Sequence, residues 1–243
     1  MLGQISGAQD EWRMNDRRRF IGLVVAGGSL ALAARKSSAP SKEPPKRTAA
    51  PVHPTEDLMR EHGVLGRMML IYEEGLKRLE SGTSISAEVI ASALRLQQHF
   101  LDDYHQKLEE DQVFPRIEAA GGRKEITRVL RQQHEAERKL TAQLLKNATP
   151  SGLGSSERRA ALVEGFRSLN RMLRPHTLWE DTVLFPAFHQ LFTGAEFEKL
   201  GETFDAFERR ALGPSGFEGV LAEVSQLEKN LGIDNLSAFT AHI

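Results

Sequence analysis

Two stretches of the sequence repeat one arrangement of histidine and glutamate. HQKLEEDQVFP begins at His105 and HTLWEDTVLFP begins at His176, and each has a glutamate four residues after its histidine, at Glu109 and Glu180. Residues i and i+4 lie on one face of a helix, about 5–6 Å apart at Cβ. Imidazole and carboxylate groups bind iron, manganese or zinc. Each stretch therefore supplies two candidate metal ligands from one helical turn.

Two more histidines stand at matching places in the chain. His62 follows Leu58 by four residues, and His134 follows Leu130 by four, at an offset of 72 residues. The two His-x3-Glu pairs are offset by 71 residues. The repeated unit is a helical hairpin, and two such hairpins predict an antiparallel four-helix bundle. The candidate ligands on its inward faces are His62, His105, Glu109, His134, His176 and Glu180.

The alternative to a metal site is a set of ordinary core histidines. A single histidine on an apolar helix face is more often a hydrogen-bonded core residue than a ligand. Four at matched positions, two with a glutamate one turn later, favour the metal site. Buried carboxylates that face each other are costly unless a cation neutralises them, and the facing helices carry too few Lys and Arg to do so.

Three further acidic residues have two possible roles each. Glu110 and Asp181 directly follow the two glutamates, where they either support a ligand from outside the metal or face solvent. Glu137 lies on the apolar face of the third helix, where it either supports a ligand or forms an exposed salt bridge. The remaining histidines lie off these faces and receive no site role.

The elements that must position these side chains are all helices. Apolar residues recur at helical spacing from Thr55 onward, and no stretch alternates as a strand does. The fold class is therefore all-α, with a bundle over residues 55–192 and an extension of one or two helices over 193–243. The bundle helices are expected at about Thr55–Glu80, from Ser84 or Ser86 to Ile117, at Lys124–Asn147 and at Glu157–Phe192.

Composition narrows the classes of function. The chain has no cysteine, which excludes disulfides, thiolate metal sites and cysteine nucleophiles. Residues 1–50 carry nine of the 32 basic and four of the 33 acidic residues, which leaves 23 basic and 29 acidic residues in 51–243. The body of the protein is therefore acidic, which argues against nucleic acid as a partner.

The basic start of the chain resembles a bacterial twin-arginine export signal over residues 1–34. Arg17 and Arg18 match the paired arginines, and an apolar run too short for a confident membrane span follows from Ile21 to Ala34. This resemblance implies the twin-arginine export machinery as a partner. The protein would then be periplasmic, or tethered to the membrane by an uncleaved signal. A basic, Gly-rich disordered tail is the alternative to an export signal. Residues 35–54, rich in Ser, Pro, Lys and Ala, predict a flexible linker.

The six candidate ligands occur in the order His, His-x3-Glu, His, His-x3-Glu. In this order the chain resembles the hemerythrin-like family of HHE cation-binding domains, over about residues 55–232. The resemblance implies a non-haem di-iron centre in which Glu109 and Glu180 bridge two iron ions. The oxygen-carrying members take the second bridge from an Asp five residues after the fourth-helix histidine, so Asp181 competes with Glu180 for that role. Two six-coordinate ions with these ligands would keep roughly two positions open for O2, NO, peroxide or water.

One position departs from the oxygen-carrying members of that family. They place another histidine one turn after the third-helix histidine, where this chain has Arg138. Arg138 either turns inward and favours anionic ligands or is a surface charge, and its presence argues against dedicated reversible oxygen carriage. The leading prediction is an exported di-iron protein that binds or senses O2, NO or iron. The alternatives are a di-iron enzyme acting on peroxide or nitric oxide, and a bundle with manganese or structural zinc.

Overall fold

The computed structural model describes residues 52–241. The predicted export signal and nearly all of the predicted linker lie outside these residues. The regular structure within the described residues is entirely helical, which confirms the all-α prediction. None of the helices in this part of the chain combines the length and apolar character needed to cross a membrane.

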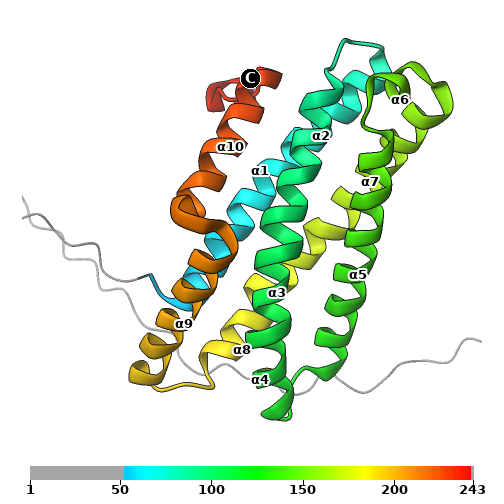
Figure 1. Cartoon of the computed structure of the whole chain (residues 1–243). Helices are drawn as coiled ribbons and strands as arrows, with labels where there is room; N and C mark the ends of the chain where they lie inside the picture. The colour runs from blue at the N-terminus through cyan, green and yellow to red at the C-terminus, as the bar shows by residue number, and fades with distance from the viewer. Residues whose placement is uncertain (1–51, 242–243) are drawn as a thin grey trace, which may run out of the picture. The chain divides into compact units, whose positions relative to one another are not determined.

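Four helical columns form the bundle (Figure 1). The first column is α1 (Pro54–Ser81), and the third is α5 (Lys124–Asn147). The second comprises α2 (Ala87–Leu96), η1 (Gln97–His105), α3 (Gln106–Leu108), η2 (Glu109–Val113) and α4 (Phe114–Ala119). The fourth comprises α7 (Ser156–Trp179), η3 (Glu180–Leu184) and α8 (Phe185–His189), and the short α6 (Pro150–Gly154) precedes it. Contacts of α1 with α2 and α7, and of α5 with α2 and α7, close the ring.

The chain continues past residue 192 as two longer helices, α9 (Gly194–Leu212) and α10 (Gly216–Leu231). The 3₁₀ turn η4 (Gly213–Ser215) joins them, and a second such turn, η5 (Leu236–Phe239), follows. Both α9 and α10 pack on α1, while α9 also contacts η1 and α10 contacts α2. Figure 1 shows them on the side of the bundle away from α5, so within residues 52–241 they cover one side of the bundle.

Helix starts and core positions follow the sequence pattern closely. Ser86, one of two expected caps, accepts the backbone N–H of Glu88 at 3.2 Å and begins α2. Pro54, assigned to the linker from sequence, instead occupies the first turn of α1, where its missing N–H costs nothing. The predicted apolar face of the first helix is buried, including Leu65 and Tyr72.

The second and fourth columns are not the continuous α-helices that the sequence predicts. The N–H of Phe114 bonds the carbonyl of Glu109, and the N–H of Phe185 bonds that of Glu180, each a π-type bond to the fifth residue back. A proline follows each phenylalanine. Because proline has no N–H and its ring clashes with the carbonyl four residues earlier, the helix widens there. The two glutamates therefore stand where the helix changes form, as is frequent at functional sites.

Candidate metal centre

The structure brings all six predicted ligands into one buried layer of the bundle. None is more than 6% exposed. His62 lies in α1 and His134 lies in α5. His105 ends η1 and His176 lies in α7, while Glu109 and Glu180 are the first residues of η2 and η3.

The histidines divide into two halves. The Nε2 atoms of His62 and His105 are 3.1 Å apart, and we call this pair the first half. The Nε2 atoms of His134 and His176 are 3.2 Å apart, and we call this pair the second half. Each half therefore joins one single histidine to one histidine of a His-x3-Glu pair, as the duplication requires.

The two glutamates connect the halves. Glu109 places Oε1 3.6 Å from His105 Nε2 and Oε2 3.4 Å from His134 Nε2. Glu180 places Oε2 3.4 Å from His62 Nε2 and 3.0 Å from the Nε2 atom of His176. Each carboxylate thus reaches both halves, which is the placement that a bridging ligand needs.

Every Nδ1 atom of the four histidines lies against a side-chain oxygen of another helix. Carboxylate and amide oxygens only accept at these positions, so Nδ1 carries the proton and Nε2 presents its lone pair to the interior. The pairs are His62 with Asp181 at 2.7 Å, His105 with Glu61 at 2.6 Å, His134 with Glu110 at 3.0 Å and His176 with Gln133 at 2.8 Å.

This arrangement fits a pair of cations. The four carboxylate oxygens of Glu109 and Glu180 are fully buried and accept no hydrogen bond. In each half two Nε2 atoms face each other at close range. Buried groups of this kind are costly without a partner, and cations among them would satisfy all of them at once. Two subsets have ligand atoms within 4.8 Å of one another: Glu109, His134, His176 with Glu180, and His62, His105 with Glu109.

The pKa values in the metal-free layer show the same need for positive charge. Burial raises the pKa of Glu109 far above its ordinary value, and the facing Glu180 adds to this. Despite its own burial, Glu180 has a lowered pKa because His176 and His62 lie beside it. The pKa of His62 rises to about 9 against the effect of burial, because Asp181 and Glu180 stabilise its charged form. Metal must displace these protons, so binding should release protons.

The residues after the two glutamates take the first of their expected roles. Glu110 and Asp181 support His134 and His62 from outside the layer, so Asp181 is not placed to bridge. Glu61 and Gln133 were not predicted from the sequence as supporting residues. Each directly precedes a single histidine of the duplicated hairpin, and that shared offset of 72 residues was the available signal.

Arg138 neither enters the layer nor stands free on the surface. Its Nη2 donates to Glu110 Oε1 at 2.6 Å, and its side chain is 31% exposed. The same carboxylate oxygen accepts a hydrogen bond from His134 Nδ1, so Arg138 supports this histidine indirectly, through Glu110. This ion pair and His134 oppose the effect of partial burial and lower the pKa of Glu110 to about 2.

Glu137 fits neither expected role. It is fully buried rather than exposed, and it accepts hydrogen bonds from Thr141 Oγ1 at 2.7 Å, Gln106 Nε2 at 3.2 Å and Gln97 Nε2. None of these donors is a predicted metal ligand. Burial and the nearby Glu137 raise the pKa of Asp102 well above its usual range.

The phenylalanines of the two Phe-Pro motifs pack against candidate ligand histidines. Phe114 stacks on His134 with ring centroids 5.6 Å apart, and Phe185 stacks on His62 at 5.3 Å. Each phenylalanine is buried and belongs to the hairpin opposite its histidine. These contacts fix the planes of the two imidazole rings.

The sequence matches the pattern of the hemerythrin HHE cation-binding domain over residues 53–188 and again over residues 125–213. The first match alone spans more than half of the chain. This chain belongs to the hemerythrin HHE family. The second match begins 72 residues after the first, which equals the offset between His62 and His134. The internal duplication of this HHE protein is therefore visible to the family pattern as well.

Several relatives of this HHE protein cover nearly its whole length. Uncharacterized proteins of Mycobacterium bovis and of two Mycobacterium tuberculosis strains are 41% identical to it over 230 residues. The alignments cover 92% of this chain and 90% of each relative. No solved structure matches the chain.

Proposed function

We propose that this HHE protein holds two iron ions in the six-residue layer and binds or senses a small ligand such as O2 or NO there. The observation that carries the proposal is the set of four buried carboxylate oxygens without hydrogen-bond partners, surrounded by four Nε2 atoms. Iron would supply redox chemistry and open coordination positions. Manganese and zinc accept the same ligand types, so the metal must be measured.

The protein's own part is to hold the ligands in one protonation state and one orientation. The four oxygens against Nδ1 keep each imidazole neutral at Nε2 when a cation is bound. The stacked Phe114 and Phe185 limit rotation of two rings. Burial of the layer excludes water from most of it, which strengthens each electrostatic contact.

Binding or sensing is favoured over dedicated oxygen carriage. The position one turn after His134 is Arg138, whose guanidinium is engaged by Glu110 rather than turned to the layer. Each half therefore has two histidines and shares the same two glutamates. Because the two halves supply the same side chains, neither ion is favoured as the place where a small molecule binds.

The test is elemental analysis of the purified protein together with its absorption spectrum in air. We expect about two iron ions per chain and visible charge-transfer bands that change on adding NO. Zinc without such bands would show the structural alternative instead. Catalytic turnover of peroxide or NO by the iron form would identify an enzyme rather than a sensor.

We also propose export by the twin-arginine route. Arg17 and Arg18 precede a short apolar run. The 92% of the chain aligned with the mycobacterial relatives is more than residues 52–243 can supply, so the similarity extends into the N-terminal segment. Cell fractionation should show that replacing both arginines by lysine traps the protein in the cytoplasm, whereas Arg19→Lys does not. Unchanged distribution of the double variant would refute export by this route.

A further inference from the structure

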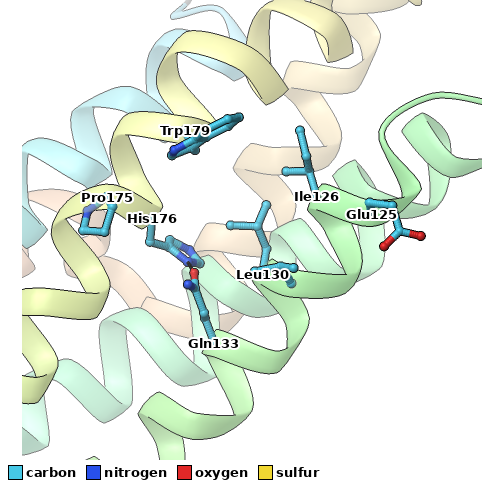
Figure 2. Close-up of a pocket in the computed structure, with 8 residues that line it drawn as sticks. Glu125, Ile126, Leu130, Gln133, Pro175, His176 and Trp179 are labelled. Atoms are coloured by element: carbon cyan, nitrogen blue, oxygen red, sulfur yellow. Dashed lines mark hydrogen bonds between the residues drawn. The ribbon is translucent and has the colours of Figure 1, made fainter. Parts of the chain in front are cut away.

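An apolar cavity opens between α5 and α7, directly against the second half of the metal centre. Its volume is about 360 Å³. Ile126 and Leu130 of α5 face Pro175 and Trp179 of α7 across it (Figure 2), and Val129 also lines it. His176 and Gln133 form its inner end, so any occupant lies next to a predicted metal ligand.

The polar groups of the cavity are few and specific. Gln133 accepts His176 Nδ1 through Oε1 at 2.8 Å, which leaves its amino group as a donor. Within residues 52–241 no protein atom accepts from that amino group. Glu125 stands at the rim and is paired with Arg128 at 2.9 Å, and no Lys or Arg lines the cavity. These walls suit an uncharged molecule with one hydrogen-bond acceptor.

The duplicated hairpin shows what this kind of surface packs against. In the first hairpin, the counterparts of Glu125, Ile126 and Gln133 lie 72 positions earlier, at His53, Pro54 and Glu61. The counterpart of Pro175 lies 71 positions earlier, at Tyr104. In the first half α9 covers this equivalent surface. Phe197 stacks on His53 with centroids 5.8 Å apart, and the ring of Phe207 lies 6.1 Å from that of Tyr104. Where the chain closes this surface itself, it does so with aromatic rings.

The size of the cavity favours a small molecule over a second helix. From Glu125 to Gln133 is eight residues of α5, about 12 Å at 1.5 Å per residue. That length suits one or two rings, whereas α9 has 19 residues. The volume also falls in the range of small-molecule sites, roughly 300–1,000 Å³. Trp179 stands at the entrance, 55% exposed, and offers its ring to a flat ligand.

We propose that this cavity binds a small, uncharged aromatic molecule of the phenol class, and that its occupancy is coupled to the metal centre. The ligand's oxygen accepts from Gln133 Nε2, and its ring lies among Trp179, Val129 and Ile126. Gln133 holds His176 at Nδ1, so a ligand that orients the amide also acts on the imidazole. The coupling rests on the proposed metal binding, but binding of the aromatic molecule does not.

The first test is a phenol titration of full-length protein as purified, followed by tryptophan fluorescence. The chain has two tryptophans, and Trp12→Phe leaves Trp179 as the only reporter. We expect a saturable change with phenol and at least tenfold weaker binding of cyclohexanol, measured by competition. A linear response without saturation would overturn the proposal.

Variants at Val129, which is 40% exposed, test the location. Val129→Arg places a long charged side chain across the cavity and should weaken phenol binding at least tenfold. Val129→Thr, of similar size, is the matched control and should bind within about twofold of the parent. Phenol binding unaffected by Val129→Arg would place the ligand elsewhere. A dimer in sedimentation that Val129→Arg dissociates, without saturable phenol binding, would show a protein contact instead.

The coupling is tested by repeating the titration after chelation of the metal. Coupled sites typically change each other's affinity about 5–150-fold, and the effect is reciprocal. We expect at least a fivefold change in the phenol dissociation constant and a matching shift in metal affinity. If chelation is shown to remove the metal and the phenol dissociation constant does not change, the two sites are not coupled. Saturable binding to a protein that never held metal would refute the proposed function and leave the aromatic site standing.

Discussion

The two halves of the metal centre come from one duplicated hairpin, yet the chain encloses them differently. In the first half, His105 Nδ1 bonds Glu61, and Glu61 also accepts the hydroxyl of Tyr104 at 2.5 Å. The equivalent residues of the second half are Gln133 and Pro175, which line an open cavity. The first half lies under α9, and the second half has no covering helix within the described residues.

The difference shows that the duplication accounts for the ligands, whereas the added helix α9 accounts for the difference in access. A charged Glu61 polarises its histidine more strongly than a neutral Gln133 can, and burial under α9 preserves that effect. The effect of the neutral Gln133 amide on its histidine is weakened little when solvent reaches it. The sealed half is therefore suited to holding its ion tightly, and the open half is suited to responding to a ligand.

The largest expected effect comes from removing a ligand that both halves share. Glu109 belongs to both groups of candidate ligand atoms, whereas His176 belongs to one. Glu109→Ala should reduce bound metal from about two ions per chain to nearly none, and His176→Ala should leave about one. Elemental analysis after desalting distinguishes them, and equal losses in the two variants would contradict the division into halves.

The next effect concerns the cover of the first half. Phe204 of α9 is almost completely buried, so Phe204→Ala should lower the free energy of unfolding by about 3–5 kcal/mol. Trp179→Ala, at the open half, should change it by no more than about 0.5 kcal/mol, because this side chain is half exposed. Denaturant unfolding of metal-free protein measures both. A large loss for Trp179→Ala would mean that the second half is closed in solution.

A smaller effect is expected from exchanging the groups that hold His105 and His176. Glu61→Gln should weaken metal binding by the first half about 10–100-fold, which is the usual cost of losing such a support. Gln133→Glu should strengthen binding by the second half by less, because solvent reaches the cavity. Competition with a chelator gives both constants. Stronger binding by Glu61→Gln would refute the role assigned to this carboxylate.

A further effect is a pH dependence on the covered side. Burial and the nearby Glu61 raise the pKa of Asp57 from 3.8 to about 7. Folding therefore favours the protonated form, so this group lowers stability progressively as pH rises from about 4 to 7. Asp57→Asn should melt at the same temperature as the parent near pH 4 and at a higher temperature above pH 7. A constant difference between them across that range would contradict the raised pKa.

The four helical columns and the candidate ligands could be predicted from the sequence alone because the decisive signals are local. Helical spacing of apolar residues marked the four columns, and the His-x3-Glu repeats placed two ligands on one face of each of two helices. The 72-residue offset then paired His62 with His134. The first two inferences depend on the geometry of a single helix, and the third depends on the repeat of the hairpin along the sequence.

The remaining features needed the tertiary structure because they join residues far apart in the chain. Glu61 meets His105 across 44 positions, and Asp181 meets His62 across 119. Helical periodicity cannot show which side chain on a neighbouring helix will lie opposite. The place of α9 over the first half was likewise set by packing, and so was the cavity beside His176. The ligands were thus a property of the sequence, whereas the difference between the sealed and open halves arose only when the helices came together.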